Sequence, residues 1–380
     1  MNSFALKDVP NGFFSKAVYL DPEFIITAPE MPITQNLLKI INTWGFNEVL
    51  SDGEPSEGYT SSEETAAPGK EKASGGRSST IDLDKIQQAE IFFANFQKYV
   101  KTLYAMLPIK NELDFNGVAE QLKPICDYVR ENRRFLLRTK WLTESVSEEN
   151  QMVSHTTRST IIAIIIGITL KLQNYRLIEV AVAALMHEVG MIKLPQENYT
   201  RKRQLSEQER KLLYAHPILG YNILKSYDFP LVICAAALEH HERENGSGYP
   251  QRKTGEKITL YAKIIAVACS YEAILSSRPH KDAKDGHTGM MELLKNEGKQ
   301  YDDTIVRALV YSLSIYPIGL YVLLSNNKKG QVVDVNPENP RYPIVEIFGE
   351  LTPNGKNKIM GTSADTFYVI RPLTPEEIKG

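Results

Sequence analysis

Two adjacent histidines, His240 and His241, carry the clearest chemical signal in the chain, in the stretch LEHHERENGSGYP. Neutral imidazoles are common metal ligands. Adjacent imidazoles at the end of an apolar helix both face a metal only if the helix end distorts or two metals lie apart. The following loop contains Gly246 and Gly248, which permit positive φ, and Pro250, which stiffens it, so its backbone can approach a ligand closely. We therefore interpret this stretch as half of an active site.

Three more histidines belong to the same part of the chain. A single histidine on an apolar helix is more often a core or surface residue than a ligand. Here each of five lies on or at the end of a predicted helix, where a rigid scaffold can direct it inward. These five are His155, His187, His216, His240 and His241. Together they indicate one shared site.

Composition narrows the class of protein. A chain of 380 residues suggests two or three domains, and its net charge of −2 gives no indication of DNA or RNA binding. The three cysteines, Cys126, Cys234 and Cys269, form no CxxC pair and fit a reducing compartment. The most apolar run, Ile161 to Leu170, is about half as long as a membrane span. No cationic, apolar leader opens the sequence, so we expect a cytoplasmic protein without a membrane span.

Changes in composition along the chain predict five segments. Residues 1–50 suggest a small β/α accessory module. Residues 51–82 are rich in Gly, Ser, Glu, Thr and Pro and predict a disordered linker. Residues 83–148 suggest a helical connector, and residues 149–317 form a run of helices with short loops. Residues 318–380 alternate in β-branched and aromatic residues and suggest a small, barrel-like antiparallel β unit. The predicted fold class is mainly α.

Hydrophobic periodicity predicts individual elements within these segments. The expected helices are 35–43, 81–107, 115–137, 151–172, 176–189, 206–226, 230–242, 260–276, 288–296 and 304–313. The expected strands are 47–50, 319–325, 331–335, 344–348 and 367–370, with short apolar runs at 17–20 and 24–26.

The histidines occur in recognisable local contexts. These are His155-Thr-Thr-Arg158, His187-Glu188-Val-Gly190, His216-Pro217-Ile-Leu-Gly220 and the HHE…GSGYP stretch, followed by Gly255-Glu256, Ala262–Ala268 and Ser277-Arg278-Pro279. In this order, over about residues 149–317, the chain resembles the HD-GYP family, a branch of the HD metallophosphohydrolases that hydrolyses cyclic di-GMP. Residues 1–50 and the β segment are more weakly similar to modules that flank this domain in longer members.

The resemblance implies a metal-dependent phosphodiesterase that converts cyclic di-GMP to pGpG or GMP in bacterial signalling. It implies two divalent ions, with a third position open, and iron or manganese with zinc as an alternative. The implied metal ligands are His155, His187, Glu188, His216, His240 and His241, with Cys269 at a ligand position, and His187 and Glu188 form the catalytic pair. The implied substrate contacts are Gly246, Gly248, Tyr249, Pro250, Arg278, Lys281 and Lys193.

Four positions depart from the family pattern. Glu188 replaces the aspartate of the HD pair, and its extra methylene moves the carboxylate by roughly 1.5 Å. Cys269 replaces a distal aspartate ligand; a thiolate there would favour zinc or ferrous iron, and the alternative is an inert buried cysteine. Met191 stands where the family has a phosphate-facing lysine, with Lys193 two residues further on. Gln151 lies where some members carry an acidic ligand to a third metal.

These departures leave other functions open. The first alternative is a degenerate member that binds a cyclic dinucleotide or a partner protein without turnover, through the GYP loop or the N-terminal module. A second is a phosphohydrolase for another nucleotide, which the GYP loop disfavours. A homodimer is compatible with the sequence.

Overall fold

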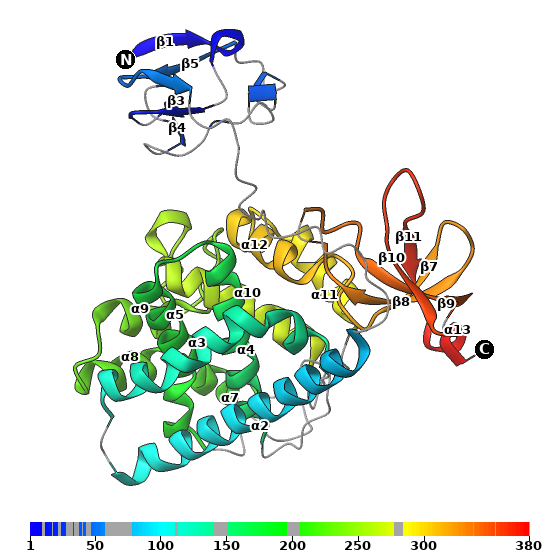
Figure 1. The fold of residues 1–380 in the computed structure, drawn as a ribbon. Helices are drawn as coiled ribbons and strands as arrows, with labels where there is room; N and C mark the ends of the chain where they lie inside the picture. Colours follow the sequence, from blue (N-terminus) through cyan, green and yellow to red (C-terminus); the bar gives the residue numbers. More distant parts are fainter. Residues whose placement is uncertain are drawn as a thin grey trace. The chain divides into compact units, whose positions relative to one another are not determined.

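The computed structural model describes residues 1–9, 12–16, 18–21, 24–27, 33, 38–39, 41–42, 47–57, 78–110, 113–139, 141, 150–195, 206–276, 284–336, 338–353 and 355–379. The chain divides into two compact units, residues 1–76 and residues 77–380. Figure 1 shows the first unit in blue.

The first unit is built mainly from short strands. Its strands are β1 (Asn2–Ala5), β2 (Gly12–Phe14), β3 (Val18–Asp21), β4 (Phe24–Thr27), β5 (Glu48–Ser51) and β6 (Pro55–Glu57), with the 3₁₀ turn η1 (Leu6–Asp8) after β1. They form a four-stranded antiparallel sheet in the order β1-β5-β3-β4 and a separate β2-β6 pair. Buried apolar residues, including Phe14, Val18 and Val49, form its core.

Both ends of the predicted linker differ from the structure. The predicted module ends at residue 50, but β6 extends ordered structure to Glu57, where it pairs with β2. The predicted linker also ends too late, because the next helix begins at Ser78. Leu38, Lys39, Ile41 and Asn42 are helical, and the rest of the predicted helix 35–43 lies outside the described residues, as do linker residues 58–77.

The second unit begins with a long helical pair, α2 (Ser78–Lys110) and α3 (Phe115–Leu137). The Asp114 side chain caps α3 by accepting a hydrogen bond from the Gly117 amide at 2.7 Å. The aromatic residues of α2 pack in the core, and Phe92 stacks on Tyr128 of α3 with ring centroids 3.8 Å apart. Both helices pack against the bundle that follows.

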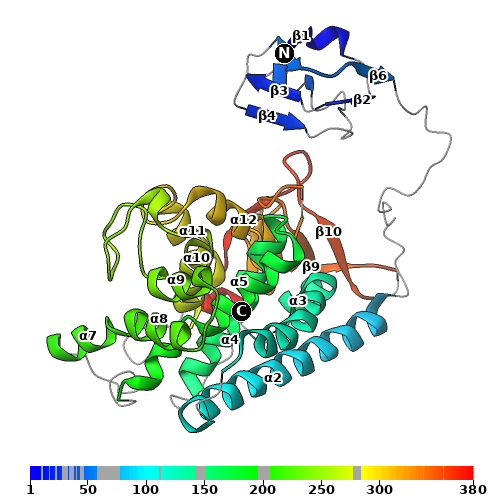
Figure 2. The same cartoon turned by 90° about the vertical axis from the view of Figure 1, so that its left-hand side faces the viewer.

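Figures 1 and 2 show this bundle arranged around one central helix, α4 (Gln151–Thr169). It packs against α2, α3, α5, α10 and α12. The bundle comprises α5 (Asn174–Met186), η3 (Val189–Lys193), α7 (Glu207–Leu213), α8 (His216–Ser226), α9 (Leu231–Glu239), η4 (Gly255–Lys257), α10 (Leu260–Leu275), α11 (Gly286–Lys295) and α12 (Asp303–Leu313). Within the described residues, α4 alone has the length and hydropathy of a membrane span, but 78% of that window is buried inside the protein, as in a core helix.

One predicted helix proves to be two. Residues 206–226 form α7 and α8, with a break at Tyr214 and Ala215. Pro217 explains the break, because proline fits the first turn of a helix and disrupts its interior. Ser206 caps α7 in a reciprocal arrangement with Glu209. The break makes His216 the first residue of a helix.

The chain ends in a five-stranded antiparallel sheet and a short helix, α13 (Pro375–Lys379). Its strands are β7 (Tyr321–Leu324), β8 (Lys329–Asp334), β9 (Ile344–Leu351), β10 (Asn357–Gly361) and β11 (Val369–Pro372), in the order β10-β9-β8-β7-β11. The sequence did not predict β10. Since β10 and β11 are edge strands of the described sheet, it is open, and the expectation of a barrel-like unit is wrong in this respect.

Gly190 allows η3 to lie directly against α8. A Cβ atom at this position would lie 2.0 Å from the His216 carbonyl oxygen and 2.6 Å from the Gly220 amide. We expect Gly190→Ala to destabilise the protein by about 1–3 kcal/mol, because two backbones must separate. Chemical unfolding of the full chain measures this. Gly361→Ala is the matched control, since a Cβ there meets nothing within 4 Å, and equal effects of the two variants would contradict the prediction.

Candidate metal centre and adjoining pocket

The seven ligand positions anticipated from the sequence meet in the interior of the second unit. They come from different elements and mostly from helix ends. His155 lies in the second turn of α4, and Cys269 lies within α10. His187 follows the end of α5, and Glu188 precedes η3. The remaining ligands are His216, which begins α8, and the pair His240 and His241, which follows α9.

The ligand atoms form two groups. Glu188, His216, His240 and His241 make up the first, and His155, His187 and Cys269 make up the second. Within each group all ligand atoms lie within 4.8 Å of one another. In the first group the Nε2 atoms of His216 and His240 are 3.2 Å apart. In the second, the Nε2 atom of His187 lies 3.5 Å from His155 Nε2 and 3.2 Å from Cys269 Sγ.

The Glu188 carboxylate lies between the two groups. Its Oε1 atom is 3.6 Å from the Nε2 atoms of both His155 and His187. Its Oε2 atom is 3.6 Å from His216 Nε2, in the first group. Each oxygen therefore faces a different group, which is how a carboxylate shared by two ions is placed.

Main-chain hydrogen bonds orient three of the imidazoles. His187 Nδ1 lies 2.6 Å from the Ala184 carbonyl oxygen, and His216 and His240 make the same contact with Leu213 and Ala237 at 2.6 and 2.9 Å. All three acceptors lie in the last turn of a helix, where carbonyl groups lack an intrahelical partner. A carbonyl accepts only, so Nδ1 carries the proton and Nε2 presents its lone pair. This tautomer fits a metal ligand.

His155 is oriented by a carboxylate instead. Its Nδ1 atom hydrogen-bonds Glu272, a residue 1% exposed in α10 that sequence reasoning did not identify. Glu272 in turn accepts from the Ser276 hydroxyl, and Arg158 donates to Ser276 at 3.0 Å. Glu272 follows Cys269 by three residues, so the two share a face of α10. That spacing is the signal that could have revealed it.

Electrostatics favour the charge states that metal ligands need at four of these groups, Glu188, Cys269, His240 and His241. At His155 and His187 burial opposes protonation, but the neighbouring Glu272 and Cys269, respectively, raise the pKa of the ring. Burial alone would raise the pKa of Glu188, but the surrounding imidazoles, His216 foremost, lower it to about 2. Burial likewise opposes ionisation of Cys269, and the neighbouring His187 lowers the thiol pKa to about 6. Burial and nearby imidazoles hold the pKa values of His240 and His241 well below the usual range, so both rings are neutral.

The adjacent histidines share one group because the helix ends before them. The α9 helix ends at Glu239, and neither His240 nor His241 continues it. Their ring centroids lie 4.1 Å apart, and both rings face His216 at 5.2 and 5.0 Å. The sequence left two arrangements open, a distorted helix end or two metals that lie apart. The described residues adopt the first, a distorted helix end.

The loop after the histidines folds back onto them. A Cβ at Gly248 would lie 2.4 Å from the His241 carbonyl oxygen, so only glycine fits there. Gly246 has a φ of +75°, which glycine adopts readily. The buried Glu242 accepts hydrogen bonds from the amides of Gln251 at 2.6 Å and Lys253 at 3.0 Å. Glu242 was not predicted from the sequence, because its role depends on the loop folding back onto it.

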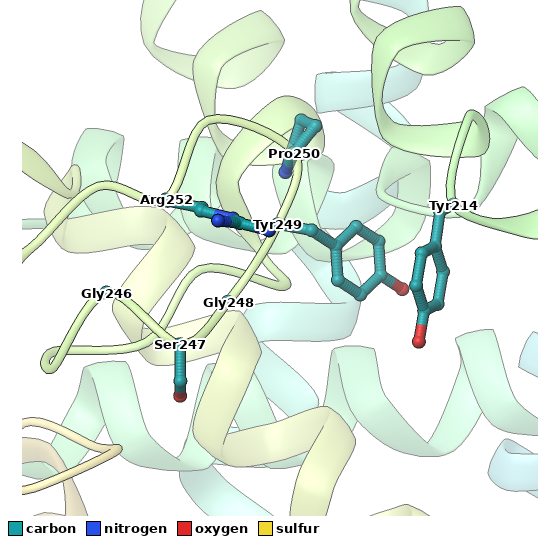
Figure 3. Close-up of a pocket in the computed structure, with 7 residues that line it drawn as sticks. All are labelled: Tyr214, Gly246, Ser247, Gly248, Tyr249, Pro250 and Arg252. Carbon is teal, nitrogen blue, oxygen red and sulfur yellow. The ribbon is translucent and has the colours of Figure 1, made fainter. Parts of the chain in front are cut away.

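The loop lines a cavity of about 500 Å³. Figure 3 shows the side chains of Tyr214 and Tyr249 lying side by side at this cavity. The Tyr249 ring stacks on His241 on one side and on Tyr214 on the other, with centroids 4.5 and 4.2 Å apart. The complete lining is Tyr214, Gly246, Ser247, Gly248, Tyr249, Pro250 and Arg252. The cavity thus adjoins the first ligand group through His241.

The other anticipated substrate contacts are not brought to this cavity. Lys193 is exposed at the end of η3, and the described residues that line the cavity do not include it. Met191 is buried, with 8% of its surface exposed. Arg278 and Lys281 lie outside the described residues. Tyr214 and Arg252 line the cavity without having been anticipated.

We expect Glu272→Ala to lower metal affinity about 10- to 100-fold, because His155 loses the partner that sets its orientation. Equilibrium titration of the purified protein with Mn²⁺ or Zn²⁺ measures this. Glu272→Gln, which keeps an acceptor for Nδ1, should retain most of the affinity. Wild-type affinity in the alanine variant would show that Glu272 does not support the site.

Comparisons with known proteins agree with this geometry. Residues 142–305 match the family model described as HD domain. The chain is 28% identical over 207 residues to "Cyclic di-GMP phosphodiesterase PdeB" of Borreliella burgdorferi, covering 54% of each. It is 37% identical over 140 residues to "Cyclic di-GMP phosphodiesterase response regulator RpfG" of Xanthomonas campestris, covering 36% of each.

The matches thus span about half or less of these curated relatives. A solved structure, Bd1817 of Bdellovibrio bacteriovorus, described as a HDG"Y"P protein, aligns with a TM-score of 0.41 at 12% identity, covering 81% of this chain and 97% of that one. The residues matched by the family model include the histidine motifs and the GSGYP loop. Residues 142–305 of the chain thus match an HD domain, and this part of the chain is similar to relatives named as cyclic di-GMP phosphodiesterases.

Proposed function

We propose that this protein is a metal-dependent phosphodiesterase that hydrolyses cyclic di-GMP to pGpG or GMP. The observation that carries the proposal is the position of Glu188, whose two oxygens face separate groups of imidazole ligands beside the loop-lined cavity. Phosphodiester hydrolysis needs charge neutralisation at the phosphate oxygens and an activated water, and two neighbouring divalent ions supply both.

The residues of the chain have distinct parts in this proposal. The imidazoles of His155, His187, His216, His240 and His241, with Glu188 and Cys269, hold the ions, iron or manganese in the first instance. His187 and Glu188, the catalytic pair of the proposal, belong to different groups, and His187 Nε2 lies 3.6 Å from Glu188 Oε1. Main-chain and carboxylate partners keep the ligand tautomers fixed before substrate arrives. The loop Gly246–Pro250 holds the nucleotide next to them.

Several observations support the choice of substrate and setting. The curated relatives reported above are named as cyclic di-GMP phosphodiesterases, and another relative, 29% identical over 130 residues, is named a 3'3'-cGAMP-specific phosphodiesterase. A cyclic dinucleotide is therefore the substrate class, with cyclic di-GMP first. Three free cysteines fit the reducing cytoplasm.

The remaining segments have accessory parts in the same proposal. Residues 149–317 form the catalytic domain, preceded by a helical connector. The first unit is an accessory module that couples the enzyme to an input, and a protein partner would bind through this module or through the GYP loop. A homodimer is compatible with the proposal. The β unit from residue 318 onwards completes the chain.

One observation favours the alternative of binding without turnover. Met191 replaces the phosphate-facing lysine, and Lys193, the nearest candidate to replace it, is exposed rather than at the cavity. A site without this cation would still hold the nucleotide through the loop but would stabilise developing charge on the phosphate less well.

Incubation of the full chain, loaded with Mn²⁺ or Fe²⁺, with cyclic di-GMP tests the proposal, with products separated by chromatography. We expect pGpG or GMP, and at least about a hundredfold loss of turnover in His240→Ala, because an ion loses a ligand. His287→Ala is the matched control, since this histidine lies outside both groups in α11. Tight nucleotide binding without product, with every metal, would replace the proposal by the binding alternative.

Tyr214 should contribute to nucleotide affinity. It is 46% exposed at the cavity, and a purine base that stacks on its free face would gain about 1–3 kcal/mol. We expect Tyr214→Ala to weaken cyclic di-GMP binding about fivefold to a hundredfold, measured by calorimetry, and Tyr214→Phe to preserve it. Tyr175→Ala, at an exposed tyrosine outside the cavity lining, is the control. Unchanged affinity in Tyr214→Ala would show that no base stacks on Tyr214 in the complex.

A further inference from the structure

The two ligand groups differ in the atoms that they offer. Glu188, His216, His240 and His241 provide only nitrogen and oxygen donors. The second group provides the sulfur of Cys269 beside two imidazole nitrogens. Thiolates select zinc, ferrous iron and other soft ions, whereas carboxylates and imidazoles also accept manganese. The two positions therefore have unequal preferences.

We propose that the position formed by His155, His187 and Cys269 binds its ion through a sulfur–metal bond and selects a thiophilic ion, zinc or ferrous iron, so that the centre is chemically asymmetric. This rests on the proposed function, in which both groups hold ions. The sulfur donates an electron pair to the ion when the bond forms, and a proton is released to solvent from the fraction of Cys269 that is still a thiol. The ion and the sulfur both keep their oxidation states.

The geometry of the group supports sulfur ligation. Cys269 Sγ lies 3.2 Å from His187 Nε2, the ring atom left free by the Ala184 carbonyl contact. The third donor, His155 Nε2, lies 3.5 Å from the same nitrogen, and Glu272 holds the opposite ring atom of His155. Three donors thus face one point, from three different elements.

The other two cysteines show what an inert thiol looks like in this protein. Cys234 is fully buried and its Sγ contacts the Phe229 carbonyl oxygen at 3.5 Å, a local contact five residues back in the chain. Cys126 is buried in α3 within the hydrophobic core. Neither belongs to a group of metal-ligand atoms among the described residues. Cys269 differs from both in its histidine neighbours, not in its burial.

Cobalt substitution tests the proposal without reference to turnover. The full chain, stripped of metal and titrated with Co²⁺, should bind about two equivalents and develop a near-ultraviolet sulfur-to-cobalt charge-transfer band, as expected for a two-ion centre with one thiolate. Cys269→Ser should lose the band and about one of the two equivalents, whereas Cys269→Asp should lose the band and keep both. Cys234→Ser is the matched control and should keep the band and both equivalents.

A competition in the unaltered protein gives the same information without a variant. One equivalent of Zn²⁺ should abolish the band, and one equivalent of Mn²⁺ should leave it. Cobalt binding without a band, or a band that survives in Cys269→Ser, would overturn the proposal while leaving the proposed function intact. Failure of the unaltered protein to bind cobalt at all would overturn both.

Discussion

The structure of the site depends on the burial of one shared carboxylate, Glu188. Polar groups removed from water are costly unless each finds a partner, and this site buries many of them together. Glu188 faces imidazoles of both ligand groups, and the imidazoles in turn hold its pKa low. The elements that carry these residues must therefore meet within a few ångströms. Close backbone packing at Gly190, where η3 meets α8, is one result of that requirement.

Helix ends meet this requirement better than helix interiors. The carbonyl groups of Ala184, Leu213 and Ala237 lie in final turns, where helical geometry leaves them without an amide partner. Each accepts from a histidine placed three residues later, so one hydrogen bond satisfies the carbonyl and fixes the ring. The same contact completes the end of the helix and prepares the ligand. Only His155, inside α4, needs a carboxylate for this purpose.

Much of this arrangement could be predicted from the sequence, because the histidines lie in short motifs at helix boundaries. The helix at Phe115–Leu137 agrees with the structure, and the seven anticipated ligand positions lie together in it, while their role as ligands stays a prediction. Glu272 could not be assigned as the partner of His155, because 117 residues separate them and only the packing of α4 on α10 brings them together. The break between α7 and α8 had a signal in the sequence, because Pro217 fits the first turn of a helix and not its interior. The strand β10 has weak β character in its sequence, and it was not predicted because its pairing with β9 is seen only in the structure.

Glu242 joins the two functional parts of the site mechanically. Its backbone follows His241 directly, and its carboxylate binds the amides of Gln251 and Lys253, on the far side of the cavity loop. Residues proposed to contact an ion and residues proposed to contact a nucleotide thus belong to one short, internally bonded segment. Under the proposed function, ligands at the two positions are linked thermodynamically. If a bound ion raises nucleotide affinity by some factor, a bound nucleotide raises ion affinity by the same factor. The fraction of metal that the protein retains then depends on nucleotide concentration.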